Sequence, residues 1–291
     1  MKRNKTKILV TGSKGLIGGE FYSILKSEHF NVKGVDTNFN IQSKKFFNFL
    51  KKFKPKIIIH CASHPGGLSF KDPIKNVQTN YLASIKIIMW CEKNNCKFVF
   101  LSSSAVYGNR NNKISLKESD PLKPETIYGI NKLALEKFIQ KYSVYRNFNW
   151  LIFRLFATYG PGHKKNNYQG IINVIISQIK NKKNVIIKGS LSRTRSLIYV
   201  KDAVKLMIDI LFKKENKKII NISSDNSYSV RTIINYIKKI YNKDFKIKVI
   251  KGTTGDPLHN IANTKLMKKF TKLKFDYDII KGISEIKKSR K

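Results

Sequence analysis

Three side chains in the middle of the chain could share one proton. Residues Ser102–Gly108 read Ser-Ser-Ser-Ala-Val-Tyr-Gly, and Tyr128 and Lys132 follow in Tyr-Gly-Ile-Asn-Lys. A Tyr and a Lys four positions apart lie on one face of a helix, with Cβ atoms about 5–6 Å apart. A nearby ammonium favours the phenolate, so we expect Lys132 to lower the pKa of Tyr128 from about 10. A phenol with a lowered pKa can take a proton from a substrate hydroxyl or give one to a carbonyl.

A glycine-rich turn supplies a second kind of chemistry. Residues Thr11–Gly18 read Thr-Gly-Ser-Lys-Gly-Leu-Ile-Gly, between a strand-like run and a helical one. Glycines there let the backbone turn tightly and approach a pyrophosphate at the helix N-terminus. Asp36 ends the next strand, where its carboxylate would accept from the ribose hydroxyls of adenosine and repel a 2′-phosphate, which favours NAD over NADP. The expected cofactor contacts of the turn are Gly12, Lys14, Gly15, Leu16, Ile17 and Gly18.

These motifs lie in a chain that alternates strand-like and helix-like segments. Such alternation predicts an α/β fold with a parallel sheet covered by helices on both faces. The strands expected in the first half are Lys7–Thr11, Asn31–Val35, Lys56–Cys61, Lys97–Leu101 and Trp150–Leu155. The helices expected between them are 16–27, 43–53, 74–94 and 126–142. The second half has helices expected near 168–181, 202–212 and 230–241, strands at 185–187, 219–222 and 246–250, and two short helices at the end.

Composition excludes several classes of protein. The formal net charge of +40 comes from 58 Lys and Arg against 18 Asp and Glu. Only eight of the basic residues are Arg and the Lys residues are dispersed, so we predict no specific nucleic-acid partner. No apolar run approaches the roughly 20 residues that span a bilayer, and the basic start lacks the apolar core of a signal peptide. Three irregularly spaced Cys predict no disulfide framework, no metal site and a cytoplasmic location.

Together these motifs resemble the extended short-chain dehydrogenase/reductase family, in its sugar-nucleotide epimerase/dehydratase branch. Ile58–Ser63 (Ile-Ile-His-Cys-Ala-Ser) is similar to the family's Val-Ile-His-x-Ala-Ala strand, with Ser63 at the last Ala. Arg154–Gly162 and Arg195–Asp202 resemble its Arg-x-x-Asn-x-Tyr-Gly-Pro and Arg-Asp-Phe-Ile-Tyr-Val-x-Asp segments, and Gly255–Pro257 its Gly-Asp-Pro.

The resemblance implies a fold, a cofactor and roles for residues. The fold would be a Rossmann-like doubly wound sheet, with residues 1–160 binding NAD. Residues 161–291 would form a smaller, mostly substrate-binding α/β part whose segment 198–222 returns to the sheet. Tyr128 would be the acid/base, and Lys132 would hold the nicotinamide ribose. Ser103 would be the catalytic hydroxyl, although Ser102 and Ser104 differ from it by only one position.

Further contacts are implied by the same resemblance. Ala62 and Asn80 would lie against the cofactor, together with Tyr128 and Lys132. Ser104, Arg195 and Asp256 would bind substrate, with Arg195 on the diphosphate. Ala157 replaces an Asn of the family pattern, and no Arg precedes Gly255, which leaves fewer phosphate ligands than usual.

The reaction type follows from what the catalytic turn lacks. Family members that eliminate water or decarboxylate carry carboxylates just after the catalytic hydroxyl, where this chain has Ser104 and Ala105. What remains is an NAD-dependent 4-epimerase of nucleotide sugars, UDP-sugars being favoured, that resembles UDP-glucose 4-epimerase. The alternatives are a reductase of 4-keto sugars, which the short segment Thr37–Pro55 favours, and a non-catalytic relative that binds nucleotide or RNA. The family usually forms homodimers, here through helices 74–94 and 126–142.

Overall fold

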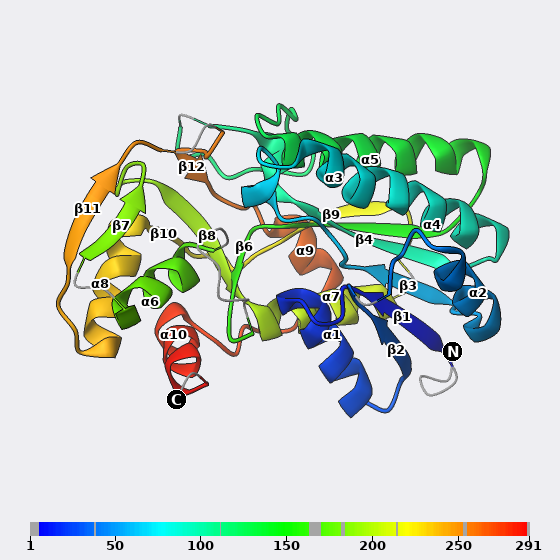
Figure 1. The fold of residues 1–291 in the computed structure, drawn as a ribbon, viewed down its shortest axis with the longest axis horizontal. Coiled ribbons are helices and arrows are strands. Elements are labelled where there is room, and N and C mark those ends of the chain that lie inside the picture. Colours follow the sequence, from blue (N-terminus) through cyan, green and yellow to red (C-terminus); the bar gives the residue numbers. More distant parts are fainter. Residues whose placement is uncertain are drawn as a thin grey trace.

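The computed structural model describes residues 6–37, 39–110, 112–162, 170–181, 184–213, 215–252 and 255–289. A parallel sheet of six strands forms its centre, in the order β2-β1-β3-β4-β5-β9 (Figure 1). These strands are β2 (Asn31–Val35), β1 (Lys7–Thr11), β3 (Ile57–His60), β4 (Lys97–Ser103), β5 (Trp150–Leu155) and β9 (Lys218–Ile222). The α/β class with a parallel Rossmann-type sheet is thereby confirmed.

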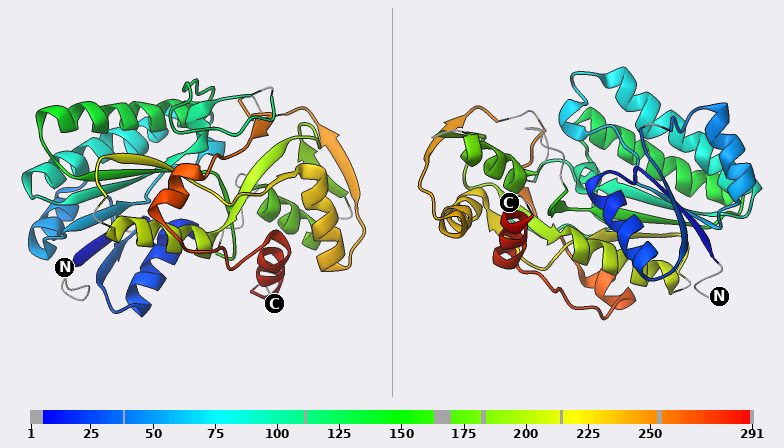
Figure 2. Two further views of the ribbon diagram at one scale, coloured as in Figure 1. Left: turned by 180° about the vertical axis from the view of Figure 1, so that it is seen from behind. Right: turned by 60° about the horizontal axis from the view of Figure 1, so that its bottom comes forward.

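The central strands contain runs of consecutive apolar residues, such as Phe98–Leu101 in β4, because helices cover both faces of the sheet. One face packs on α1 (Leu16–Ser27) and α7 (Val200–Phe212), around Phe21, Leu25 and Met207. The opposite face packs on α2 (Lys44–Phe53), α4 (Ala83–Lys93) and α5 (Ile127–Tyr145). The views in Figure 2 show these helices on either side of the sheet.

The strand order reverses direction between β1 and β3. From β1 the chain goes to one edge to form β2, and then crosses to the other side to form β3 and β4. Ligands of open parallel sheets bind at such a reversal, beside the carboxyl ends of the strands. The turn after β1 and the loop after β3 flank this point, so both lie where a dinucleotide is expected.

The predicted helix 74–94 is three consecutive segments. A short α3 (Pro73–Val77), begun by the Asp72 side chain that accepts from Lys75 N, passes into a π-helical turn (Gln78–Leu82) and then α4. The π-helical turn carries Asn80 inward, where its side chain is buried. Such wide turns within helices are frequent at functional sites.

A second layer lies beside the main sheet. It contains β8 (Thr194–Tyr199), which pairs with β6 (Ala157–Tyr159), β10 (Ser227–Ser229) and β12 (His259–Asn260). A separate ladder joins β7 (Asn184–Lys188) to β11 (Lys246–Ile250). The helices of this layer are α6 (Ile171–Asn181), α8 (Val230–Tyr241) and α10 (Ile279–Lys288), while α9 (Lys265–Phe270) packs on the main sheet. The three strands of only two or three residues were not predicted, since so short a run has no readable period.

Candidate active site

A cavity of about 820 Å³ lies between the main sheet and the second layer. One wall comes from the turn after β4 and from the start of α5, including Ser103, Ser104 and Tyr128. The facing wall comes from β7 and β8 and includes Arg193 and Arg195, with Asp256 beside them. Hydroxyl groups therefore face basic groups across a space large enough for a small-molecule ligand.

The first turn of α5 brings Tyr128 to Ser103. The Thr126 hydroxyl begins the helix by accepting from Gly129 N at 3.0 Å. A Cβ on Gly129 would lie 2.7 Å from Ala105 O, so only glycine lets the helix approach the turn after β4 this closely. Ser103 and Tyr128 thereby line the same cavity, and the Ser103 hydroxyl lies near enough to the phenol to lower its pKa.

The register of the serines is clear in the structure. Ser103 Oγ also accepts from Ala105 N at 3.2 Å, which fixes its orientation at the end of β4. Ser102 Oγ instead donates to the buried carboxylate of Glu136 at 2.5 Å. Ser104 is buried and lines the cavity. Ser103 is thus the serine of the three whose hydroxyl lowers the pKa of the Tyr128 phenol.

The expected effect of Lys132 on Tyr128 is wrong for the protein in this state. Burial raises the pKa of Tyr128 to about 12, against hydrogen bonds from Ser103 and Ser63 that lower it. Lys132 Nζ lies 5.5 Å from the ring centroid of Tyr128 and donates to Leu101 O at 2.8 Å. Burial lowers the pKa of Lys132 itself to about 8. The four-residue spacing correctly predicted that Tyr128 and Lys132 lie near each other. A spacing carries no information on how deeply the two side chains are buried.

The turn after β1 fits a dinucleotide pyrophosphate. Gly12 has a φ of +70°, and a Cβ there would lie 2.7 Å from Ala62 N. A Cβ on Gly18 would lie 2.2 Å from Gly12 O, and Gly15 N donates to that same oxygen at 3.0 Å. Gly15 directly precedes α1 and has no side chain to cap the first N–H groups of the helix. This bare helix N-terminus is a suitable site for phosphate oxygens.

Asp36 lies beside the same turn. Its carboxylate accepts from Lys14 N and from Thr37 N, both at 2.7 Å. The acid at the end of β2 is therefore held against the glycine turn, as the NAD interpretation requires. Leu16 and Ile17 instead pack against the core beneath α1.

The loop after β3 is organised by buried polar side chains. Asn80 Oδ1 accepts from His64 N at 2.6 Å, and Asn80 Nδ2 donates to His64 O at 3.0 Å. Ala62 N donates to the Thr11 hydroxyl at 3.2 Å, which joins this loop to the glycine turn. Asn80, expected at the cofactor, thus holds the backbone of the loop in the structure described here.

His60 at the end of β3 belongs to the scaffold. Its ring nitrogens lie 2.8 Å from Thr11 Oγ1 and 2.9 Å from Ser84 Oγ, and the residue is 2% exposed. Burial, with the charge of Lys132, lowers the pKa of His60 to about 3. The imidazole is therefore neutral at physiological pH.

The predicted substrate residues Arg195 and Asp256 meet, and a second arginine joins them. Arg195 donates to Asp256 Oδ1 at 2.6 Å, while Arg193 pairs with Oδ2 of the same carboxylate. Both guanidinium groups are mostly buried and line the cavity. Burial and the charge of Arg193 lower the pKa of Arg195 to about 10. Sequence reasoning missed Arg193, which directly precedes β8 and lies two residues before Arg195.

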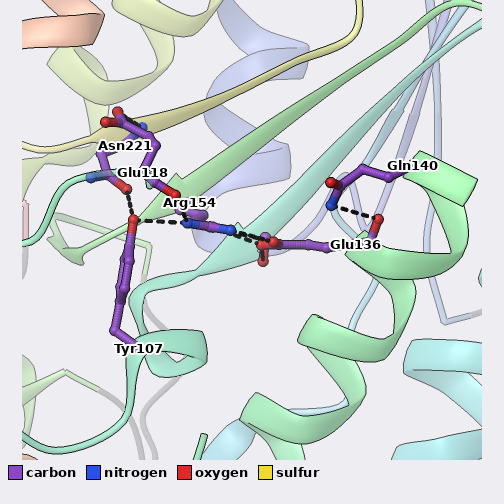
Figure 3. A network of polar contacts seen from close by, with 7 residues as sticks. Tyr107, Glu118, Glu136, Gln140, Arg154 and Asn221 are labelled. Carbon is purple, nitrogen blue, oxygen red and sulfur yellow. Dashed lines mark hydrogen bonds and ion pairs between the residues drawn. The ribbon is translucent and has the colours of Figure 1, made fainter. Parts of the chain in front are cut away.

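A second group missed from the sequence lies behind the catalytic turn. Glu136 and Arg154 form an ion pair at 2.7 Å, with side chains 0% and 2% exposed. Arg154 also donates to the Tyr107 hydroxyl at 2.9 Å, and Tyr107 donates to Asn221 Oδ1 at 2.7 Å (Figure 3). The network thus joins α5, β5, β9 and the turn after β4. The signal that could have revealed it is the position of Glu136, four residues after Lys132.

Within the described ranges, no group of three His, Cys, Asp or Glu side chains is arranged to hold a metal ion. No helix in the same ranges has the length and apolar character needed to cross a bilayer.

Comparisons with known proteins agree with this geometry. The model of the NAD dependent epimerase/dehydratase family matches residues 8–223. The chain is 26% identical over 288 residues to dTDP-4-dehydro-6-deoxyglucose reductase of Escherichia coli, covering 90% of this chain and 89% of that protein. It is 27% identical over 289 residues to the uncharacterized UDP-glucose epimerase YtcB of Bacillus subtilis (strain 168), covering 88% and 89%. A solved UDP-N-acetylglucosamine 4-epimerase from Methanobrevibacter ruminantium M1 superposes with a TM-score of 0.87 at 25% identity, over 98% of both chains.

Proposed function

Because the chain belongs to the NAD-dependent epimerase/dehydratase family, whose cofactor is NAD, we propose that it is a nucleotide-sugar 4-epimerase. The observation that carries the proposal is the wall formed by Ser103, Ser104, Ala105 and Tyr128. Ser103, Ser104 and Tyr128 supply hydroxyls there, but neither Ser104 nor Ala105 is a carboxylate that could assist elimination. The wall can move one hydroxyl proton and is unequipped to remove water.

Different residues transfer the proton and bind the cofactor and the substrate. NAD, when bound, accepts a hydride from the sugar carbon and returns it. Tyr128 takes the proton of the sugar hydroxyl as that carbon is oxidised, and gives it back on reduction. Ser103 holds the same sugar oxygen, and the ammonium of Lys132 would hold the nicotinamide ribose of the cofactor. Gly12, Gly15 and the start of α1 would hold the pyrophosphate of the cofactor, with Asp36 on the ribose.

We assign the diphosphate of the substrate to the two arginines of the cavity. Arg193, which pairs with Asp256, supplies a second guanidinium in a chain that lacks the family's Arg before Gly255. Planar guanidinium groups bind phosphate oxygens in pairs, and two of them suit two adjacent phosphates. One carboxylate, Asp256, faces both arginines, so a ligand with two anionic groups balances their charge better than Asp256 alone.

The proposal is tested with the protein as purified. We expect it to equilibrate UDP-glucose and UDP-galactose without added cofactor, as followed by chromatography of the nucleotide sugars. Tyr128→Phe should abolish turnover and leave NAD binding intact, because the phenol transfers the proton and the ring remains. The matched control is Tyr145→Phe, since Tyr145 is 83% exposed and distant from the cavity wall. Full activity of the Tyr128→Phe variant would refute the assignment.

A reductase of nucleotide-linked 4-keto sugars is the second candidate. The relative from Escherichia coli is named as a dTDP-4-dehydro-6-deoxyglucose reductase and matches nearly the whole chain. The wall around Tyr128 suits that reaction equally well, because it needs one proton and one hydride. Consumption of added NADH in a 1:1 ratio with a 4-keto sugar, with no epimerisation, would establish the reductase and exclude the epimerase.

We also propose that the protein forms a homodimer through α5 and the helical segment 73–93 that precedes it in the chain. Large apolar side chains stay exposed there: Ile74, Val77, Leu82, Met89 and Ile130. Several exposed apolar side chains on neighbouring helices favour an interface with another chain. Light scattering at moderate salt should report twice the 33.6 kDa mass of one chain. The division into a cofactor part (1–160) and a mainly substrate-binding part (161–291) remains part of the same proposal.

A further inference from the structure

The loop between β3 and α3 lies against the ring of Tyr128. It contains His64, Pro65 and a single 3₁₀ turn, Gly66–Leu68. A Cβ on Gly66 would lie 3.1 Å from both Cγ and Cδ1 of Tyr128, so the backbone of the loop packs directly on the phenol ring. Gly66 and Tyr128 also line the same cavity. The contacts that hold this loop therefore determine how far water can reach the phenol.

His64 is the residue at which the loop is held. Its N–H donates to Asn80 Oδ1 at 2.6 Å, and its carbonyl oxygen accepts from Asn80 Nδ2 at 3.0 Å. Its ring Nδ1 lies 3.2 Å from Asn76 Nδ2, and Asn76 Oδ1 accepts from Asn131 Nδ2 at 2.8 Å. Asn131 lies on α5, three residues after Tyr128, and α3 with Asn76 packs beside this helix (Figure 1). Buried amides thus join the loop to the helix that carries Tyr128.

The orientation of the Asn76 amide follows from its neighbours. Its Nδ2 faces two atoms of His64, Nδ1 at 3.2 Å and the carbonyl oxygen at 3.5 Å. A carbonyl oxygen only accepts, so the nitrogen of the amide must lie on this side. Turning the amide round would set its oxygen against that carbonyl and its nitrogen against Asn131 Nδ2. His64 Nδ1 must therefore accept, which the neutral imidazole can do and the protonated one, with two N–H donors, cannot.

We propose that Asn76 and Asn131 are positioning residues for Tyr128, which hold the loop over the phenol by binding His64 in its neutral form. Protonation of His64 adds one proton from solvent to Nδ1 and sets this new N–H against the amide nitrogen of Asn76. The loop then leaves the phenol ring and admits water to the cavity. Only the effect of this movement on turnover rests on the proposed function.

The charged groups at the start of α3 act on His64 in opposite directions. Partial burial is the largest influence and lowers the pKa of His64 below its ordinary 6.5. The carboxylate of Asp72 raises this pKa, and the ammonium of Lys75 lowers it. Neutral His64 is therefore the form present at pH 7, and acid is needed to open the loop.

The groups that face the loop from β3 and α5 keep their charge in the same pH range. Burial lowers the pKa of His60 to about 3 and raises that of Cys61, so both are neutral. Burial also raises the pKa of Tyr128 to about 12 and lowers that of Lys132 to about 8, and the ammonium of Lys132 donates to Leu101 O. A movement of the loop between pH 7 and pH 5 therefore reports His64.

The first experiment uses the unaltered protein without substrate. NMR of the imidazole Cε1–H signals gives the titration of His64, whose signal is assigned by its loss in His64→Gln. Hydrogen exchange, corrected for its intrinsic pH dependence, is followed at the amides of His64, Leu68 and Ser69, which are hydrogen-bonded in the closed loop. We expect exchange to rise about tenfold as His64 is protonated, because a buried donor then has no acceptor. Protection that persists through the His64 titration would overturn the inference.

The variant Asn76→Asp tests the contact itself. Its carboxylate has the shape of the amide, still accepts from Asn131 and sets a second oxygen against His64 Nδ1. A facing carboxylate stabilises the imidazolium, so the pKa of His64 should rise by about one unit and the loop should stay closed in acid. Asn147→Asp is the matched control, because it adds the same charge at an exposed position beyond the far end of α5. It should leave the His64 titration unchanged.

The remaining imidazole signals report whether each variant is folded. An unchanged His64 pKa in folded Asn76→Asp would contradict the contact on which the inference rests. Turnover then separates the inference from the proposed function. A loop that opens with His64 in a protein that converts no nucleotide sugar upholds the inference and rejects the function, whereas an active epimerase whose loop stays protected does the reverse.

Discussion

The protein contains two arginine–carboxylate groups near the cavity, and they differ in burial and in net charge. Glu136 and Arg154 are fully buried, and hydrogen bonds to Ser102 and Tyr107 complete their coordination. Asp256 is 32% exposed and is shared by Arg193 and Arg195 on the cavity wall. The first group has one charge of each sign, whereas the second has an excess of positive charge.

This difference separates a structural ion pair from an exchangeable one. A buried pair with complete coordination cannot admit another anion without leaving a charge unpaired, which is strongly unfavourable. A partly exposed carboxylate between two guanidinium groups can be displaced by, or share them with, a more highly charged anion. Burial and charge balance, rather than the presence of an Arg, therefore identify the binding residues.

The largest effect expected is on the stability of the buried pair. Glu136→Gln should lower the free energy of unfolding by about 3–5 kcal/mol, because it leaves the guanidinium of Arg154 without a counter-charge in the core. Urea denaturation followed by circular dichroism measures this. Asp256→Asn is the comparison variant and should cost less, since that carboxylate is partly exposed to water whereas Glu136 is fully buried. Equal losses for the two variants would remove the distinction between the groups.

A pH titration of protein stability tests whether the fold holds the buried His60 neutral. The unfolded chain binds a proton at His60 near pH 6.5, whereas burial holds the folded pKa at about 3. Between these two pKa values the unfolded state carries one proton more than the folded state. His60 therefore leaves the free energy of unfolding unchanged above pH 6.5 and lowers it as the pH falls below that value. The slope should approach about 1.4 kcal/mol per pH unit.

His60→Gln should flatten the stability profile between pH 6 and 4, whatever its cost at pH 7. The control is His29→Gln, because His29 is exposed. A His60→Gln profile parallel to that of the wild type in this range would show that His60 is not held neutral by the fold.

The smallest effect expected is on the affinity for ligands of the group formed by Asp256, Arg193 and Arg195. Arg193→Gln should weaken binding of UDP about tenfold, equal to about 1.4 kcal/mol, and weaken binding of UMP less. Calorimetry with UDP, UMP and uridine measures both ratios. Lys188→Gln is the control, since Lys188 also lines the cavity without joining the Asp256 group. An equal loss for UMP and UDP would mean that Arg193 does not discriminate the second phosphate.

Local features of the sequence predicted most of the helices and strands. They also predicted the glycine turn and the placement of Tyr128 and Lys132 on one helix face. Period and turn residues placed α1, α8 and the strands of the main sheet within one or two residues, because these signals act between near neighbours. The approach of Ser103 to Tyr128 was expected from a family resemblance. The structure adds a physical reason for it, the close contact at Gly129.

The remaining parts of the site depend on contacts between distant segments. Arg154 meets Glu136 from another element, and Asp256 reaches Arg193 across 63 positions. No local period reports such pairs. The pKa of Tyr128 was predicted in the wrong direction for the same reason, because burial is set by everything that packs around a group and not by its spacing from a lysine.

The buried face of α5 links the packing of the core to the positions of the catalytic residues. Tyr128, Lys132 and Glu136 follow one another at four-residue intervals, so one helix face carries the proton donor, the ammonium and the anchor of the core. A shift of this helix by a single residue would rotate all three away together. The ion pair of Glu136 with Arg154, which fixes the register of α5 in the core, therefore also fixes the register of Tyr128 and Lys132.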